Sequence, residues 1–451
     1  MRSRSASADA DEDPFDAGSA QGRGILHQPM AVWATAGASV VAFMGIGLVD
    51  PILPSIAKGL DASPSQVSLL FTSYFLITAV AMLVTGFVSS RIGGRKTLLV
   101  GLALVIVFAA LSGTASSVNE LVGFRAGWGL GNALFVSTAL AVIVGAANPV
   151  EPRAGGRRSS GSATAILLYE SALGLGMACG PLLGAVLGDM KWRYPFFGTA
   201  VLMAVGFLAI SVFLREQPTP ARKTSLLDPV KALGHGGLAS AAASAFFYNY
   251  AFFTVLAFTP FVLNMTPYKS GAVFFAWGLL LAVFSVLVAP RLQERYGSLR
   301  VLAASLALMG ADLVLLGYGS HTTAIVCTIV SGAFIGVNNT VYTELALGVS
   351  PAPRPVASAG YNFVRWFAAA AAPYLAPKIE EWSDIHMPFV VAALAAVVGA
   401  GIIVVRRSAL TLQAEQLEPA HAAQDSVGVF ANEPAAAQTT PHHAAGGSRA
   451  N

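Results

Sequence analysis

The chain has 451 residues, of which 55% are hydrophobic and only 11% are charged, and its formal net charge at pH 7 is +4. A globular domain carries roughly 25% charged residues, so this composition excludes a water-soluble enzyme. The long stretches of Ala, Leu, Val and Gly are continuous rather than alternating, which also excludes the strands of a membrane barrel. The sequence predicts an all-α membrane protein.

The first segment, residues 1–29, is polar and carries five acidic residues between Asp9 and Asp16. It lacks the basic start of a signal peptide, so we expect a disordered cytoplasmic tail. Twelve apolar runs follow, each long enough to cross a bilayer core of roughly 30 Å as a helix. They lie at 31–57, 64–88, 97–115, 119–146, 162–188, 194–214, 238–264, 270–290, 300–318, 321–348, 357–376 and 386–405.

A polar segment, residues 215–236, divides these runs into six and six. We therefore expect two six-helix bundles, residues 30–214 and 237–405, joined by a cytoplasmic loop. The last segment, residues 406–451, is rich in Ala, Gln, His and Pro, which is typical of a disordered tail. The sequence contains no metal-ligand cluster and no phosphate-binding loop, so we expect no metal and no cofactor.

The positions of the basic residues predict the orientation of the chain. If the N-terminus is cytoplasmic, the inner segments hold 20 of the 27 Lys and Arg residues and the outer segments hold 5. Cytoplasmic loops of membrane proteins carry such an excess. We therefore expect both termini to be cytoplasmic. The net positive charge then follows from membrane topology, and no nucleic-acid partner is implied.

The two halves contain related segments. The loop GFVSSRIGGRK at 86–96 aligns with PRLQERYGSLR at 290–300 at an offset of 204, so that Arg91 meets Arg295 and Gly93 meets Gly297. The segment that begins at Tyr169 aligns with the segment that begins at Tyr361 at an offset of 192. Such repeats of six helices place a binding site between the two halves, near the middle of the membrane.

These residues resemble the major facilitator superfamily, and within it the twelve-helix multidrug exporters that work by proton antiport. The loop pattern G-x-x-x-D-R-x-G-R-R is matched by Gly86, Arg91, Gly93 and Arg95, with Ser90 and Gly94 at the two departures. The fourth run matches an Arg followed by glycines, at Arg125, Gly129 and Gly131. The fifth matches the exporter pattern G-x-x-x-G-P-x-x-G-G at Gly176, Gly180, Pro181 and Gly184, with Ala185 in place of the last glycine.

Charged side chains within the spans are candidate proton-coupling groups, because a charge in the membrane interior normally faces a cavity or a partner. Asp50 lies beside Pro51 and Pro54, which break the first span, and it is either a proton or cation site or a wetted helix end. Glu170 could exchange its proton for a cationic compound, or form a permanent ion pair with an arginine. The resemblance implies that Arg125 tunes a nearby carboxylate; the alternative is that it extends to the outer interface.

Residues of the resembling motifs are candidate gating residues. Gly176, Gly180 and Gly184 line one face of the fifth span, where another helix can approach closely, and Pro181 bends that span. The resemblance implies a pliable contact between the halves; ordinary tight packing is the alternative. At the inner loops, Arg91 and Arg295 could form contacts only when the inner side is closed, with Glu294 as one partner. The predicted gating set also contains Gly86, Gly93 and Arg95. The same basic residues also fit a purely topological role.

Aromatic and amide side chains within the spans are candidate substrate contacts, since their polar tips need a partner or water. The predicted set is Tyr74, Tyr169, Tyr248, Asn249, Asn338, Tyr361, Asn362 and Arg365. Arg365 lies at the depth of Glu170 and could pair with it or bind an anionic group.

We expect a monomeric transporter in the cytoplasmic membrane that exports small amphipathic or aromatic compounds in exchange for protons. Its partners would be the substrate, protons and the lipid bilayer. Proton symport or uniport of a small nutrient remains an alternative, as does a membrane receptor or assembly partner that transports nothing.

Overall fold

The computed structural model describes residues 28–147, 160–216 and 225–430. Every regular element in these ranges is helical, as expected where lipid cannot satisfy backbone polar groups. The first half contains α1 (Met30–Gly47), η3 (Asp50–Ile52), α2 (Leu53–Gly59), α3 (Pro64–Ile92), α4 (Gly94–Thr114), α5 (Val118–Ala147), α6 (Ser160–Met190) and α7 (Tyr194–Phe213). The second half contains α8 (Asp228–Leu233), α9 (Gly236–Leu263), α10 (Pro267–Val283), η4 (Phe284–Val288), α11 (Ala289–Tyr296), α12 (Ser298–Tyr318), α13 (His321–Gly348), α14 (Arg354–Trp382) and α15 (Met387–Phe430).

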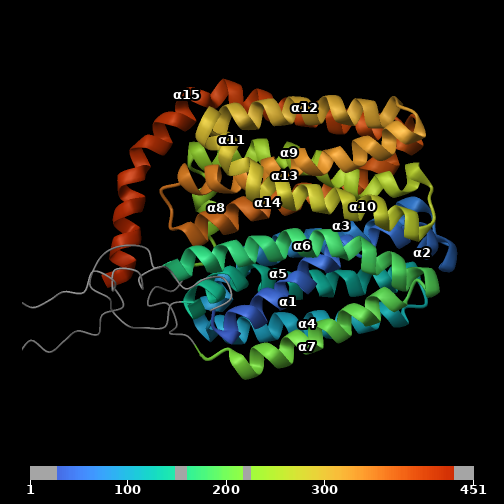
Figure 1. The fold of residues 1–451 in the computed structure, drawn as a ribbon, viewed down its shortest axis with the longest axis horizontal. Coiled ribbons are helices and arrows are strands. Elements are labelled where there is room, and N and C mark those ends of the chain that lie inside the picture. The colour runs from blue at the N-terminus through green and yellow to red at the C-terminus, as the bar shows by residue number, and fades with distance from the viewer. Residues whose placement is uncertain (1–27, 148–159, 217–224, 431–451) are drawn as a thin grey trace, which may run out of the picture.

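The helices form two bundles with nearly parallel axes, α1 to α7 and α9 to α15 (Figure 1). Within the described ranges, eleven helical segments are long and apolar enough to cross a membrane. The twelfth is α14, which runs between α3 and α9 but carries Arg365, Lys378 and Glu380 along its length. The predicted all-α membrane protein of twelve helices in two bundles is confirmed.

The two halves meet along two helix pairs, α3 with α14 and α6 with α10. The short helix α8 lies at one end of the bundles, which we call the loop end; α2 lies at the opposite end, which we call the far end (Figure 1). At the far end, Ser65 at the start of α3 donates a hydrogen bond to Glu381 near the end of α14. This contact joins the two bundles.

The predicted internal repeat is visible in the backbone. Gly93 and Gly297 have φ values of 86° and 81°, a conformation that favours glycine, and each links two helices. Their N–H groups donate to the carbonyls of Ser89 and Gln293 at 3.0 and 2.8 Å. A related pair of contacts recurs inside the bundles. Gly129 abuts the backbone of Tyr74, and Gly332 abuts the backbone of Trp277. Both residues of the second pair lie 203 positions after those of the first, close to the offset of 204 between the loops.

Three helical segments differ from simple continuous spans. The first span breaks at η3, as its prolines predict. The eighth contains the π-helical turn η4, just before Pro290, which has no backbone N–H to donate. The last helix continues to Phe430, so the predicted disordered tail from residue 406 is wrong for 406–430. Its extension is anchored, because Leu410 is buried and Arg406 donates to Ser240 on α9 at 3.2 Å. The expected tails at 1–27 and 431–451 lie outside the described residues.

The glycine stripe of α6 faces α1 and not the other bundle. A Cβ atom on Gly176 would lie 2.5 Å from the carbonyl oxygen of Val40, and one on Gly180 would lie 2.5 Å from that of Met44. Gly184 similarly abuts the backbone of Leu48. The expected contact between the halves is therefore wrong for this stripe. The glycine face of α6 can pack closely against only one helix, and that helix is α1.

A different face of α6 meets the second half. Gly278 on α10 lies against the backbone of Ala178, where a Cβ atom would be 2.5 Å from its Cα. Gly271 abuts Ala185 and the Pro181 carbonyl. Of the four predicted residues of the α6 motif, only Pro181 therefore touches both sides: its ring lies against Gly47 on α1 and its carbonyl against α10.

We expect Gly180→Ala to lower the free energy of unfolding by about 1–3 kcal/mol, because the new methyl group would push α1 away from α6. Gly37→Ala on α1 is the matched control, since a Cβ atom there meets nothing within 4 Å. Thermal unfolding of the purified protein in detergent would measure both. Equal melting temperatures for the two variants would contradict the proposed close packing.

Candidate functional site

A small cavity lies between the two bundles, with about 40 Å³ of space, enough for only a few water molecules. Side chains from six helices line it. The lining comprises Phe43 and Ile46 from α1, Leu173 and Met177 from α6, Phe252 and Phe253 from α9, Leu281 from α10, Ile335 and Asn339 from α13, and Arg365 and Trp366 from α14. Since both halves contribute, rocking of one half against the other would change its shape.

Arg365 is the one charged side chain in this lining, and two amides of the second half hold it. Its Nε donates to Asn249 Oδ1 on α9 at 3.2 Å, and its Nη2 donates to Asn339 Oδ1 on α13. Among the described residues, the one ion pair within 4 Å joins Lys96 to Glu216, far from the cavity in the sequence. No described carboxylate therefore forms an ion pair with Arg365. Among the described residues, the guanidinium is thus positioned by neutral groups.

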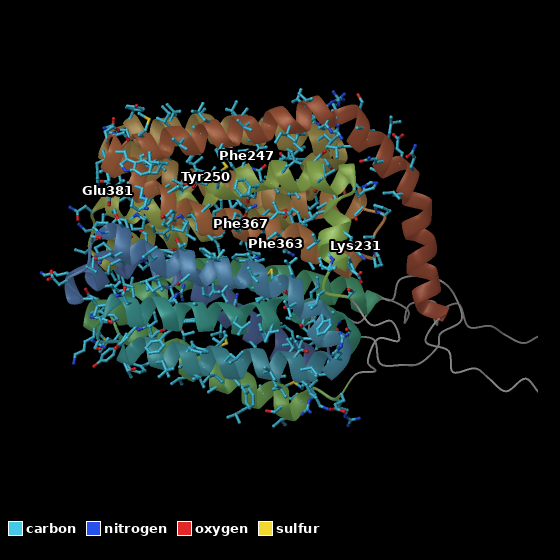
Figure 2. All side chains as sticks on the ribbon, turned by 180° about the vertical axis from the view of Figure 1, so that it is seen from behind. Lys231, Phe247, Tyr250, Phe363, Phe367 and Glu381 are labelled. Atoms are coloured by element: carbon cyan, nitrogen blue, oxygen red, sulfur yellow. The ribbon has the colours of Figure 1, made fainter. Side chains whose placement is uncertain are left out.

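Aromatic rings connect the two bundles beside Arg365. Phe75 on α3 lies 4.6 Å from the ring of Phe253 and 5.4 Å from that of Trp366, measured between centroids. Phe252 stacks on Phe253 at 4.3 Å. These rings provide an apolar surface for a flat molecule. Figure 2 shows this face of the molecule with α9 and α14 side by side; it labels their side chains Phe247, Tyr250, Phe363 and Phe367.

A second cluster of charged groups lies in the first half, one helical turn beyond the cavity-lining Ile46. Asp50 and Arg125 are both fully buried, and they interact electrostatically without an ion pair within 4 Å. Among the described residues, neither Asp50 oxygen has a hydrogen-bond partner. The η3 turn that carries Asp50 contacts α6 in its own half and α9 and α10 in the other. A carboxylate therefore lies where both halves meet.

Arg125 lies inside the first bundle, so extension to the membrane interface is excluded. Its guanidinium carbon lies 4.4 Å from the ring centroid of Tyr74 and 4.6 Å from that of Trp128, distances typical of cation–π contacts. Its Nη1 donates to the Gly45 carbonyl at 3.4 Å. Gly45 directly precedes Ile46 of the cavity lining. The α1 backbone thus links Arg125 to the cavity wall.

The third predicted proton-coupling residue, Glu170, has a side chain outside the described residues. Its backbone is part of α6, three residues before Leu173 and seven before Met177. Residues at this spacing share one face of a helix. The role of Glu170 therefore stays a prediction.

Of the predicted substrate contacts, only Arg365 lines the cavity; the others serve the packing around it. Tyr248 donates to the Ile335 carbonyl at 3.0 Å, Tyr169 to the Val136 carbonyl at 3.3 Å, and Asn338 lies 4.0 Å from Met309 Sδ. Tyr74 lies under Arg125, Asn249 supports Arg365, Tyr361 is buried near Arg365, and Asn362 donates to Ser358. Tyr169, Tyr248, Asn249 and Asn362 thus bond to protein groups through their polar tips, as buried polar groups usually do.

Sequence reasoning missed most of the lining because it searched for polar tips. Phe43, Phe252, Phe253 and Trp366 carry no such signal, and apolar residues occur on every face of these helices. The sequence offered one clue: Trp366 directly follows the predicted Arg365, so the two lie at the same depth.

The predicted gating residues of the loops make contacts within their own halves. Arg95 donates to the Ser211 carbonyl on α7 at 2.8 Å, and Arg295 lies over the Tyr296 ring at 5.3 Å. Arg91 lies 3.3 Å above the Phe87 ring and donates to that residue's carbonyl. Gly86 lies within α3, Gly93 forms the turn that follows it, and Glu294 lies on α11. Gln293, and not Glu294, reaches another helix, donating to Glu344 on α13 at 2.7 Å.

We expect the energetic effects of Asp50→Asn and Arg125→Gln to be coupled by about 0.5–3 kcal/mol. Removing one charge leaves the other buried without compensation, whereas removing both does not. Thermal unfolding of the two single variants and the double variant in detergent would measure this coupling. Strictly additive effects would mean that the two charges do not interact.

Comparisons with known proteins agree with this architecture. The family model described as Major Facilitator Superfamily matches residues 35–373. The chain is 48% identical over 392 residues to the multidrug efflux protein YfmO of Bacillus subtilis, covering 86% of this chain and 96% of that protein. It is 26% identical over 300 residues to the class G tetracycline resistance protein of Vibrio anguillarum, covering 62% and 72% of the two chains.

Solved structures show the same fold at low sequence identity. The human organic anion transporter MFSD10 matches with a TM-score of 0.66 at 18% identity, covering 83% of this chain and 99% of that one. A D-xylose-proton symporter matches with a TM-score of 0.69 at 14% identity, covering 83% and 96%. With two six-helix bundles enclosing a shared cavity and a family model that spans most of its length, this chain belongs to the Major Facilitator Superfamily.

Proposed function

We propose that the protein exports small amphipathic or aromatic compounds in exchange for protons, by alternating access of the central cavity. The observation that carries this proposal is the aromatic cavity between the two bundles, one helical turn from the buried Asp50. The name of the Bacillus subtilis relative, a multidrug efflux protein that matches over nearly its whole length, supports the direction of transport. The protein acts as a transporter and not as an enzyme.

The architecture fits a moving interface. Glycines bring α6 and α10 into backbone contact, and small residues allow such helices to slide or separate without bulky side chains catching on each other. The cavity is small in this structure, so substrate entry requires the halves to move apart. The Ser65 and Glu381 contact holds them together at the far end. Opening at the loop end then exposes the cavity to the proposed cytoplasmic side.

Proton binding at Asp50 supplies the coupling in this proposal. Its turn contacts α9 and α10 of the opposite half, so a change in its charge alters the interface directly. Glu170, on α6, is the second proton site in this proposal. A membrane potential of 100 mV contributes about 2.3 kcal/mol per proton, which supports a substrate gradient of tens-fold.

In this proposal the protein is a monomer in the cytoplasmic membrane, with its loop end in the cytoplasm. The positive-inside distribution supports this orientation, since Arg91, Arg95 and Lys96 lie at that end.

We expect Glu170→Gln to abolish proton-linked flux and Asp50→Asn to weaken it, because an amide cannot carry the proton. The assay uses inside-out membrane vesicles with an acidified lumen and a panel of cationic, neutral and anionic aromatic compounds. Antiport predicts that adding a transported compound releases protons from the lumen. Asp312→Asn is the matched control, because Asp312 is also buried within a span but lies on α12, outside the cavity lining.

The outcomes of that assay separate the alternatives. Proton movement in the opposite direction would indicate symport, and no flux of any compound would contradict transport. Unchanged proton-linked flux in both carboxylate variants would remove Asp50 and Glu170 as proton sites.

The orientation is tested by replacing one exposed lysine at each end with cysteine. We expect a membrane-impermeant maleimide to label Lys191→Cys, at the far end, on intact cells. Lys96→Cys, at the loop end, should react only after the membrane is permeabilised. Both lysines are exposed at helix ends. The native Cys179 and Cys327 lie within spans and provide the background signal in the parent protein. The reverse labelling pattern would invert the proposed topology.

A further inference from the structure

The described lining of the central cavity is chemically one-sided. It contains one cation, Arg365, one amide, Asn339, and otherwise only apolar side chains, four of them aromatic. No described carboxylate belongs to it. The buried carboxylate of Asp50 lies outside the lining and interacts with Arg125. A ligand that contacts these described side chains therefore meets a positive charge and aromatic surfaces.

The contacts of Arg365 leave it able to bind a ligand. Its Nε and Nη2 donate to Asn249 and Asn339, and its side chain also interacts with that of Tyr361. A guanidinium has five N–H donors in a planar fork, so donors remain beyond these three contacts. The side chain is partly exposed and lines the cavity, whereas Arg125 is fully buried. Two amide oxygens fix its orientation and contribute no negative charge, which favours an anion as the missing partner.

The aromatic part of the cavity complements this charge. Trp366 directly follows Arg365 in the chain, and its ring lies 6.0 Å from that of Phe253 and 5.4 Å from that of Phe75. An aromatic ligand lying against these rings would place a substituent close to the guanidinium. A cationic substituent at that point would face a like charge away from bulk water, where such repulsion is strong.

From this juxtaposition we infer that the cavity selects aromatic compounds that carry an anionic group, such as a carboxylate or sulfonate, over cations of the same size. The aromatic rings bind the body of the ligand, and the Arg365 fork binds the anionic group. This inference rests on the proposed function in one respect only, that the central cavity is the transport site.

Equilibrium binding to the full chain in detergent tests the inference, with calorimetry as the readout. Three probes share one ring system: 2-naphthalenesulfonate, the neutral 2-naphthalenesulfonamide and trimethyl-2-naphthylammonium. We expect the sulfonate to bind at least about tenfold more tightly than the ammonium compound, as a charge-assisted hydrogen bond would give. Equal or tighter binding of the ammonium compound to the unmodified protein would overturn the inference, whatever the variants do.

Variants of Arg365 locate the preference. Arg365→Gln should weaken sulfonate binding by about tenfold and change sulfonamide binding by less than about twofold, and that retained binding also shows that the variant is folded. Arg365→Lys should keep part of the preference, because it retains the charge but loses the fork. Arg406→Gln, an exposed arginine that also donates to a neighbouring helix, is the control and should change nothing. An unchanged sulfonate-to-ammonium ratio in Arg365→Gln would overturn the inference.

Flux of the same three probes in proteoliposomes separates this inference from the proposed function. If the binding order holds but a pH gradient drives no probe, proton-coupled transport fails and the ligand class stands. If a pH gradient drives only the ammonium compound, the ligand class is overturned and proton-coupled transport stands.

Discussion

A hydrocarbon interior solvates neither peptide groups nor charges, and this constraint governs the structure. The described chain is helical throughout its spans because each helix satisfies its own backbone. Two arginines within the spans are held by protein groups. Arg125 lies over two aromatic rings and Arg365 is held by two amides. In the proposed function, charges within the spans mark the places where the two bundles interact with protons and ligands.

The same constraint explains the use of glycine. Helices in lipid gain little from burying apolar surface against one another, so they associate through close contact of small residues. The α6 helix uses two such faces. Gly176, Gly180 and Gly184 attach it to α1 and make the first bundle rigid, while Ala178 and Ala185 meet the glycines of α10 across the interface. One helix therefore belongs firmly to its own bundle and also provides a smooth surface for the other.

The site divides its chemistry between the halves. The first half contributes the buried carboxylate of Asp50 on a broken helix, close to Arg125. The second half contributes Arg365 with its amide partners, next to the aromatic rings. The turn that carries Asp50 contacts helices of the opposite half, and Ile46, one turn away, lines the cavity. In the proposed function, proton binding and ligand binding thus act on the same interface from its two sides.

The sequence by itself determined the all-α membrane class, the twelve helices, the two-fold repeat and the break at Pro51, because hydropathy, proline and glycine act locally along the chain. It also singled out Arg125 and Arg365 as charges within the spans, since few charges occur there. Only the tertiary structure decided which helix the α6 glycines face, that the last helix continues to Phe430, and that Tyr248 and Asn338 support the cavity wall without lining it. Those outcomes depend on how helices rotate about their axes and which neighbours they meet. In α9 and similar helices, apolar residues such as Phe252 and Phe253 occur all around the helix. The amino-acid pattern therefore contains no periodic signal that fixes this rotation.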